Sequence, residues 1–454
     1  CVDGAQCGAD ACRMSRTNCY RYTRRATVVA AAEGGPSDRR TRPTAGLFAL
    51  VLAFLAACGG EDTPPPEGPA AAARAVRPGV EVLLSDSLHL VAGRRVGLVT
   101  NHTGVDSRGR SDIDLLADHP ALDLVALYAP EHGIRGDAAE GATIEADVDS
   151  RTGLPIHSLY GATLAPTPAM LEGIDVLLFD MQDIGARYYT YVSTLAYSMR
   201  AAGENGIPFI VLDRPNPIRG DVVQGNVLDP EFATFVGMFP VPMRHGMTPG
   251  ELARLYVGEF GIEVELAVVP VDGWSRSDTF ADTELPWIAP SPNMPSLESA
   301  LAYPGACLFE GTPLSVGRGT ERAFQQVGAP WLDGEALASV LNGYGMPGVS
   351  FEAVTFTPVR PTDGKFDGVE VHGVRLVGTT STYDAPRAAV AMLVEARRAS
   401  RPNWTWNVAH IDRLAGTDAL RLGIDAGRDL AALTAGWDGG IRDFEGMRAP
   451  YLIY

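Results

Sequence analysis

Residues 94–101 read RRVGLVTN, and residues 174–184 read IDVLLFDMQDI. Both are continuous runs of Val, Leu and Ile that end in polar residues, and similar runs occupy 122–129 and 207–213. Continuous apolar strands are typical of parallel sheets, because helices cover both faces of such a sheet. Helix-like segments separate the four runs. We therefore predict a Rossmann-like α/β domain with a parallel sheet over residues 79–305.

Helices are expected between these strands at 113–117, 168–173 and 188–202, and the second of them is short. Thr248 is expected to begin a further helix that runs through Val257, because Glu251 stands three residues later and completes the capping-box pattern. After Trp331 the pattern changes, and it predicts a smaller α+β domain over residues 306–454. Its helices are expected near 334–343, 386–397 and 426–436, and its strands near 349–358 and 369–377.

Residues 291–324 read SPNMPSLESALAYPGACLFEGTPLSVGRGTERAF. The segment is so rich in Pro and Gly that most of it is expected to be neither regular helix nor central strand. Buried charges cost stability unless they build a site. We therefore expect the segment to line an active-site cleft at the junction of the two domains. Its charged and amide residues are Asn293, Glu298, Glu310, Arg318, Glu321 and Arg322.

The first 57 residues are a different kind of sequence, with four of the six cysteines and no periodic apolar pattern. An Arg-rich stretch precedes the apolar run 47–55. That run is too short for a permanent membrane span, which needs about 20 apolar residues. It leads into Leu-Ala-Ala-Cys, with the cysteine at Cys58. This order of charge, apolar core and small residues predicts a bacterial lipoprotein signal peptide.

Cys58 is then the expected lipidated N-terminus of an exported envelope protein. Residues 1–57 are expected to be a signal peptide with an upstream extension, and residues 58–78, which are rich in Pro, a linker. The lipid is the only membrane attachment that we expect. Because no acidic residue directly follows Cys58, we expect the periplasmic face of the outer membrane if the host is Gram-negative.

The composition disfavours several classes of function. A formal net charge of −18 and a single lysine, Lys365, leave no basic patch for nucleic acid. After Cys58 the only cysteine is Cys307, so disulfides are not expected. Dinucleotide-binding, phosphate-loop and serine-hydrolase motifs are absent from the sequence, and no cofactor is expected. A metal site is not expected either, because the available ligands lack the spacing of known motifs. These ligands are His102, His132, His245 and Asp183.

Polar residues follow each predicted strand of the first domain. Ligands of open parallel sheets bind outside the carboxyl ends of the strands, so four polar strand ends predict a polar cleft. Its expected members are Asn101, Glu131, His132, Asp183, Arg187, Asp213 and Arg214.

Carboxylate chemistry suits this cleft best. Glu131 follows one strand, and Glu310 and Glu321 lie in the long segment described above. Two carboxyl groups that flank a cleft, one of them kept protonated by apolar surroundings, suit hydrolysis of a glycosidic bond. Aromatic residues near these positions can stack on sugar faces. They are Tyr128, Tyr188, Tyr189, Trp287 and Tyr303.

Seven strings carry a resemblance to a known family. They are GLVTNHTG (97–104), YAPEHGIRGD (128–137), TGLPIHSLYG (152–161), FDMQDIGARYYTY (179–191), LDRPNPIRG (212–220), PMRHGMTPGELA (242–253) and the segment 290–331 with its FEGT and GRGTER motifs. With them, residues 85–454 resemble the exo-β-N-acetylmuramidase family (NamZ-type, glycoside hydrolase family 171), formerly a family of unknown function. The resemblance implies two domains of the kind predicted. It also implies cleavage of terminal, non-reducing N-acetylmuramic acid from peptidoglycan fragments.

The resemblance implies that Glu131 of PEHG and Glu310 of FEGT are the catalytic carboxylates. An apolar flank helps to keep a carboxyl group protonated, which favours Glu131 as the general acid. Glu310 is then a base or an electrostatic stabiliser, and the 2-acetamido group of the substrate remains an alternative nucleophile. The lactyl carboxylate of muramic acid requires a guanidinium, for which the candidates are Arg187, Arg318 and Arg322. Contacts to hydroxyl or acetamido groups are expected from Asn101, Asp183, His245 and Asn293.

The sequence leaves a second class of function open. The same cleft without a competent acid would make a non-catalytic, muramyl-sugar-binding envelope lipoprotein.

Overall fold

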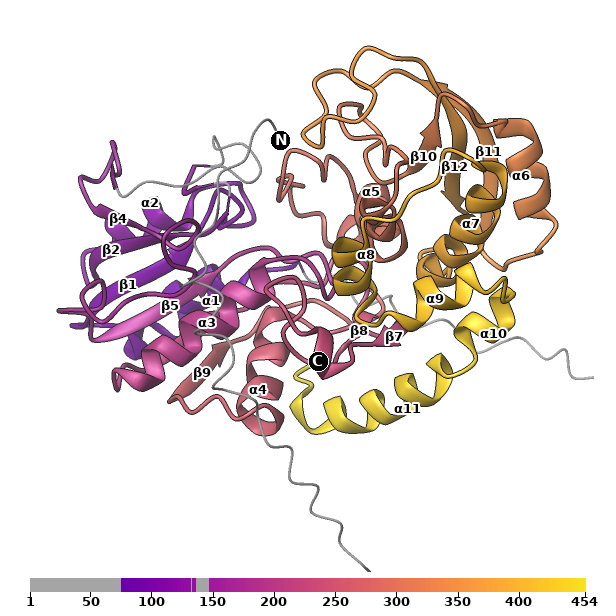
Figure 1. Cartoon of the computed structure of the whole chain (residues 1–454). Helices are drawn as coiled ribbons and strands as arrows, with labels where there is room; N and C mark the ends of the chain where they lie inside the picture. Colours follow the sequence, from indigo (N-terminus) through magenta and orange to yellow (C-terminus); the bar gives the residue numbers. More distant parts are fainter. Residues whose placement is uncertain (1–74, 132, 136–146) are drawn as a thin grey trace, which may run out of the picture. The chain divides into compact units, whose positions relative to one another are not determined.

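The computed structural model describes residues 75–131, 133–135 and 147–454 (Figure 1). The expectations for residues 1–57, for Cys58 and for His132 lie outside these ranges, as does most of the linker 58–78. Within the described ranges, no helix has the length and apolar character that a membrane span requires.

The larger sheet has seven strands in the order β3-β4-β2-β1-β5-β6-β9. Their bounds are β1 (Arg95–Thr100), β2 (Asp123–Ala129), β3 (Asp147–Val148), β4 (Pro155–Ser158), β5 (Val176–Asp180), β6 (Phe209–Leu212) and β9 (Leu266–Val269). All neighbouring strands are parallel except β3 and β4, which are antiparallel. The predicted parallel sheet is confirmed, with a short antiparallel strand added at one edge.

Successive residues of the central strands enter two different apolar cores. Leu177 and Phe179 of β5 join the core that contains α3 and α4. Val176 and Leu178 join the core on the other face, with α1 and α2. Because both faces are covered, these strands read as continuous apolar runs. The four helices are α1 (Gly79–Asp86), α2 (Asp112–Ala117), α3 (Tyr191–Glu204) and α4 (Pro249–Glu259).

Two local expectations for the helices of this domain have different outcomes. The capping box of α4 is confirmed: the Thr248 hydroxyl accepts a hydrogen bond from the Glu251 N–H at 3.2 Å, and the Glu251 carboxylate accepts one from the Thr248 N–H at 3.1 Å. The helix expected at 168–173 is wrong, because these residues form turns that end at Gly173, with φ +83°. Leu171 is the one buried residue of these six, so packing does little to offset the cost of starting a helix.

The second half of the chain contains a three-stranded antiparallel sheet in the order β10-β12-β11 (Figure 1). Its strands are β10 (Gln326–Ala329), β11 (Val349–Phe356) and β12 (Val371–Gly378). A separate antiparallel pair lies earlier in the chain and consists of β7 (Gln224–Val227) and β8 (Pro242–Arg244). The helices are α5 (Leu297–Ala306), α6 (Gly334–Asn342), α7 (Ala385–Ala399), α8 (Val408–Ala415), α9 (Ala419–Asp425), α10 (Leu430–Thr434) and α11 (Trp437–Arg448). The predicted smaller mixed domain is confirmed, although the helix expected near 426–436 is only the short α10.

Helix α5 interrupts the segment that we expected to be largely irregular. Ser296 begins it by accepting a hydrogen bond from the Ser299 N–H at 3.3 Å, and Pro304 lies inside it. A proline removes one backbone donor from a helix. Burial of α5 against α7 offsets that loss, since Tyr303 and Ala306 belong to the main apolar core. The chain then tightens into the 3₁₀ turn Cys307–Gly311.

The last residues of the chain return to the first half. Arg448, at the end of α11, donates hydrogen bonds to the carbonyls of Gly220 and His245 at 3.1 and 3.2 Å. Tyr454 donates its hydroxyl to Asp213 at 2.8 Å. The two halves are therefore joined by polar contacts as well as by a shared apolar core.

Candidate active site

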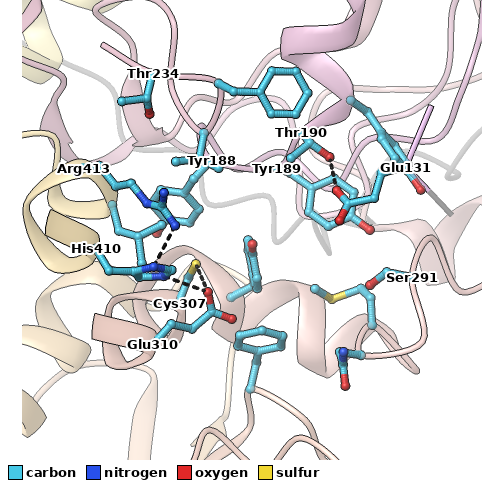
Figure 2. Close-up of a pocket in the computed structure, with 18 of the residues that line it drawn as sticks. Glu131, Tyr188, Tyr189, Thr190, Thr234, Ser291, Cys307, Glu310, His410 and Arg413 are labelled. Atoms are coloured by element: carbon cyan, nitrogen blue, oxygen red, sulfur yellow. Dashed lines mark hydrogen bonds and ion pairs between the residues drawn. The ribbon is translucent and has the colours of Figure 1, made fainter. Parts of the chain in front are cut away.

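A cavity of about 420 Å³ is lined by residues from both halves of the described chain (Figure 2). Its volume lies in the range of small-ligand sites, roughly 300–1,000 Å³. Its walls come from the turn after β2, the start of α3, the loops at 234–236 and 291–294, the 3₁₀ turn after α5, and α8. Only one of the four polar strand ends, that of β2, contributes directly.

Glu131 forms one side of this cavity. It follows β2 and Pro130, and it is only 9% exposed. Its Oε2 accepts a hydrogen bond from the Thr190 hydroxyl at 3.0 Å, and Thr190 stands directly before α3. Among the described residues, this hydroxyl is the only hydrogen-bond partner of Glu131, and no cation pairs with it. The carboxyl group therefore lies against a neutral wall, free to face a ligand.

Glu310 lies across the cavity from Glu131 (Figure 2). Its Oε1 accepts a hydrogen bond from Arg318, and its Oε2 lies 3.5 Å from His410 Nε2 and 3.9 Å from Cys307 Sγ. Burial raises the pKa of Glu310, but the Arg318 guanidinium and the His410 ring outweigh burial and hold the pKa at about 2. Glu310 is therefore an anion near neutral pH and cannot supply a proton.

Two glycines fix the position of Arg318. Gly317 and Gly319 have φ of +76° and +78°, and a Cβ on Gly319 would lie 2.7 Å from the Val359 carbonyl oxygen. The tight turn directs Arg318 towards Glu310 and across the ring of Phe324, 5.2 Å from its centroid. The glycines of the GRG motif thus serve to place one guanidinium.

Aromatic rings form much of the remaining wall. Tyr303 makes edge-to-face pairs with Tyr188, Tyr189 and Phe324, at centroid distances of 5.6, 5.8 and 4.6 Å. All four line the cavity. The structure thus places three of the five predicted aromatic residues there. Of the other two, Tyr128 donates its hydroxyl to the Met170 carbonyl, and Trp287 packs against Phe280.

Several predicted binding residues belong instead to buried polar networks outside the cavity lining. The guanidinium of Arg187 donates hydrogen bonds to four backbone carbonyl groups, those of Asn226, Val241, Leu414 and Ala415. Arg214 pairs with Asp180 and donates to the Val105 carbonyl. These guanidiniums connect loops and do not face the cavity.

The other strand-end residues have similar partners. Asn101 accepts hydrogen bonds from the N–H and hydroxyl of Thr103 at 2.9 and 2.6 Å. Asp183 accepts from the Gly185 N–H at 2.7 Å, and its carboxylate lies 3.6 Å from the buried ring of His245. None of these three lines the cavity.

Two residues of the GRGTER motif also lie elsewhere. Glu321 is exposed, and Arg322 lines a separate cavity of about 420 Å³ with Leu297, Arg375 and Tyr383. Of the predicted site residues, the cavity gathers Glu131, Asn293, Glu310 and Arg318.

Sequence reasoning missed the contribution of α8. His410 and Arg413 line the cavity beside Glu310, and they are joined by a 2.7 Å hydrogen bond from Arg413 Nη2 to His410 Nδ1. Neither belongs to a string that we singled out, and no local spacing relates them to Glu310. Thr190 was also missed, although it stands inside the FDMQDIGARYYTY string.

Asp213 lies outside the cavity, but its burial predicts a pH effect on stability. It accepts hydrogen bonds from Thr248, Gly250 and Tyr454 at 2.7, 2.7 and 2.8 Å, and burial raises its pKa to about 7. Between pH ~4 and 7 the folded state therefore keeps a proton that the unfolded state has lost, so stability falls as pH rises, by up to about 1.4 kcal/mol per pH unit.

The variant Asp213→Asn removes this titration. We expect the unfolding free energy of the wild type, minus that of the variant, to decrease between pH 5 and 7 in denaturant titrations. The exposed Asp443→Asn serves as the matched control. An Asp213→Asn difference that is the same at both pH values would contradict the assignment.

Within the described ranges, no group of three or more His, Cys, Asp or Glu side chains is arranged to hold a metal ion.

Comparison with known proteins identifies the family. Residues 96–298 match the family described as "Exo-beta-N-acetylmuramidase NamZ, N-terminal", and residues 301–454 match its C-terminal counterpart. The peptidoglycan beta-N-acetylmuramidase NamZ of Bacillus subtilis (strain 168) is 42% identical over 381 residues, which are 84% of this chain and 91% of the relative.

Two crystal structures of DUF1343 family proteins from Bacteroides fragilis NCTC 9343 have similar folds. Their TM-scores are 0.77 and 0.69, at 36% and 30% sequence identity, and each comparison covers 84% of this chain and 99% of the other. These likenesses support the mixed α/β architecture. Since the two family matches span most of the chain, it belongs to the exo-β-N-acetylmuramidase NamZ family of glycoside hydrolases.

Proposed function

We propose that this protein is an exo-acting glycoside hydrolase that releases terminal, non-reducing N-acetylmuramic acid from peptidoglycan fragments by carboxylate chemistry. One observation carries the mechanism: Glu131 and Glu310 face one cavity from opposite sides, in contrasting environments (Figure 2). Glycosidic bond hydrolysis needs one carboxyl group that gives a proton and one that stays ionised.

Glu131 is the general acid in this proposal. Its described hydrogen-bond partner is the neutral Thr190 hydroxyl, and it lines the cavity. In the proposed reaction it gives a proton to the leaving-group oxygen as the glycosidic bond breaks. The Thr190 hydroxyl orients the carboxyl group towards the cavity.

Glu310 is the carboxylate that stays ionised. Arg318 and His410 favour its anionic form, and its side chain is only 17% exposed. A fixed negative charge stabilises the positive charge that develops on the anomeric carbon, and the same carboxylate can accept a proton from the attacking water. Attack by the 2-acetamido group of the substrate is compatible with the electrostatic role.

The neutral residues of the wall suit a sugar ring. Tyr188, Tyr189 and Tyr303 offer aromatic surface, and Asn293 offers an amide for hydroxyl or acetamido groups. Aromatic faces of this kind pack against the C–H surface of a pyranose while polar groups at the edges fix its orientation.

A pair of chromogenic substrates tests the proposed function. We expect the protein to release the aryl group from an aryl β-N-acetylmuramide and to leave the corresponding β-N-acetylglucosaminide largely intact. Hydrolysis of neither substrate would favour a non-catalytic muramyl-binding protein. Preferential hydrolysis of the glucosaminide would contradict the substrate assignment.

We also propose that the protein is an envelope lipoprotein anchored through Cys58. The Arg-rich flank, the apolar run 47–55 and the small residues before Cys58 support this proposal. Mass spectrometry of protein purified from the cell envelope should find a diacylated cysteine at the new N-terminus. A protein that retains residues 1–57 without lipid would contradict it, and Cys58→Ser should release the protein from the membrane fraction.

A further inference from the structure

We propose that Arg413 binds the lactyl carboxylate of N-acetylmuramic acid and thereby distinguishes this sugar from N-acetylglucosamine. The inference rests on the proposed function and deepens it. Two arginines line the cavity, Arg318 and Arg413, and their surroundings differ. Figure 2 shows Arg413 beside His410.

Arg318 is already occupied. It forms the ion pair with Glu310, donates a hydrogen bond to the Thr362 hydroxyl at 2.9 Å, and covers the ring of Phe324. Moving it towards a ligand would leave Glu310 without its main counter-charge. Arg318 therefore serves the protein's own carboxylate.

Arg413 is placed to receive a ligand. It projects from α8 at the edge of the cavity and is exposed. Among the described residues it pairs with no carboxylate, and its one side-chain hydrogen bond runs from Nη2 to His410 Nδ1 at 2.7 Å. A guanidinium has five N–H donors, so this bond orients Arg413 and leaves the other donors available.

The same bond places His410 between Arg413 and Glu310. A guanidinium can only donate, so His410 Nδ1 accepts from Arg413, while the ring Nε2 faces Glu310 at 3.5 Å. The carboxylate of Glu310 is therefore next to His410 and not to Arg413. Among the described residues, Arg413 is the positive charge on this wall of the cavity that has no carboxylate partner.

The charges in the cavity explain why an arginine is needed here. Glu310 is ionised and balanced by Arg318, and the whole chain carries a net charge of −18. A sugar with its own carboxylate would be repelled unless a second cation receives it. The planar guanidinium suits a carboxylate, whereas N-acetylglucosamine has no group that gains from it.

Three substrates and three variants test this inference. The substrates are an aryl β-N-acetylmuramide, the same glycoside with its lactyl carboxyl group converted to a primary amide, and the aryl β-N-acetylglucosaminide. For Arg413→Met we expect kcat/KM on the acid to fall at least about fivefold, because charge-assisted hydrogen bonds at exposed sites are weaker than buried ones. On the amide, kcat/KM should change by less than about twofold. Arg413→Lys should keep part of the preference, and Arg442→Met, an exposed arginine on α11, should keep all of it.

An equal loss on the acid and the amide would overturn the inference, since it would mean that Arg413 acts only through His410. No loss on the acid would also overturn it. If the wild type hydrolyses none of the three glycosides, the proposed hydrolase function is contradicted, whatever the role of Arg413. Calorimetric binding of free N-acetylmuramic acid and its lactyl amide then decides the role of Arg413, with tighter binding of the acid expected in the wild type and equal binding in Arg413→Met.

Discussion

Glu131→Gln should lower turnover of a muramyl disaccharide by about 10²–10⁴-fold, the usual contribution of general-acid assistance. Glutamine keeps the shape of the side chain and can still accept the hydrogen bond from Thr190, but it has no proton to transfer. The loss should depend on the leaving group, because an activated aryl group departs with little protonation. We therefore expect the variant to retain much more of its activity on an aryl glycoside than on the disaccharide.

The matched control for this experiment is Glu263→Gln, an exposed glutamate that is not part of the cavity lining. Both variants should melt within a few degrees of the wild type. If Glu131→Gln hydrolyses the disaccharide at close to the wild-type rate, Glu131 has no part in the chemistry.

Glu310→Gln should lower turnover by about 10²-fold or more on both kinds of substrate, because the lost charge acts on the anomeric carbon and not on the leaving group. The variant should also be less stable by about 2–4 kcal/mol, since the largely buried Arg318 would lose its counter-charge. Steady-state kinetics on both substrates and denaturant unfolding measure the two effects.

A second variant separates these effects. Glu310→Gln combined with Arg318→Met removes both charges, so it should recover part of the stability but none of the activity. Recovery of activity in the double variant would show that Glu310 only balances Arg318. Because the folded-state pKa of Glu310 is about 2, its stabilising contribution is present above pH ~4.5 and is lost as the pH falls towards 2.

The sheet of this protein could be predicted because each of its central strands is marked by its own continuous run of apolar residues. Val176 and Leu178 face one core and Leu177 and Phe179 face the other, so all four residues before Asp180 in β5 had to be apolar. Helix α5 could not be predicted in the same way. Pro304 argues against a helix locally, and the packing that outweighs it comes from α7, which lies much later in the chain.

The candidate site could be predicted only in part. The rule that ligands bind at strand ends led to Glu131 and failed for Asn101, Asp213 and Arg214, because polar residues at the other strand ends bond to one another and to backbone groups. A sequence does not show whether a polar side chain faces a ligand or a neighbouring loop.

The contribution of α8 depends entirely on tertiary structure. His410 reaches Glu310, and Arg413 reaches His410, because α8 packs against the 3₁₀ turn Cys307–Gly311. A Cβ on Gly311 would lie 2.6 Å from Ile411. This close approach requires a glycine in the FEGT motif. The FEGT motif can be recognised in the sequence, but the packing of α8 against its glycine cannot.

Product analysis of two disaccharides that contain the same two sugars in opposite order is the most direct test of the proposed exo-acting muramidase activity. We predict that the protein cleaves N-acetylmuramyl-β-1,4-N-acetylglucosamine into its two free sugars, detected by mass spectrometry, and that Glu131→Gln does so at least about 100-fold more slowly. The reversed disaccharide, with N-acetylglucosamine at the non-reducing end, should remain intact. Cleavage of the reversed disaccharide alone, or of neither by the wild type, would contradict the account.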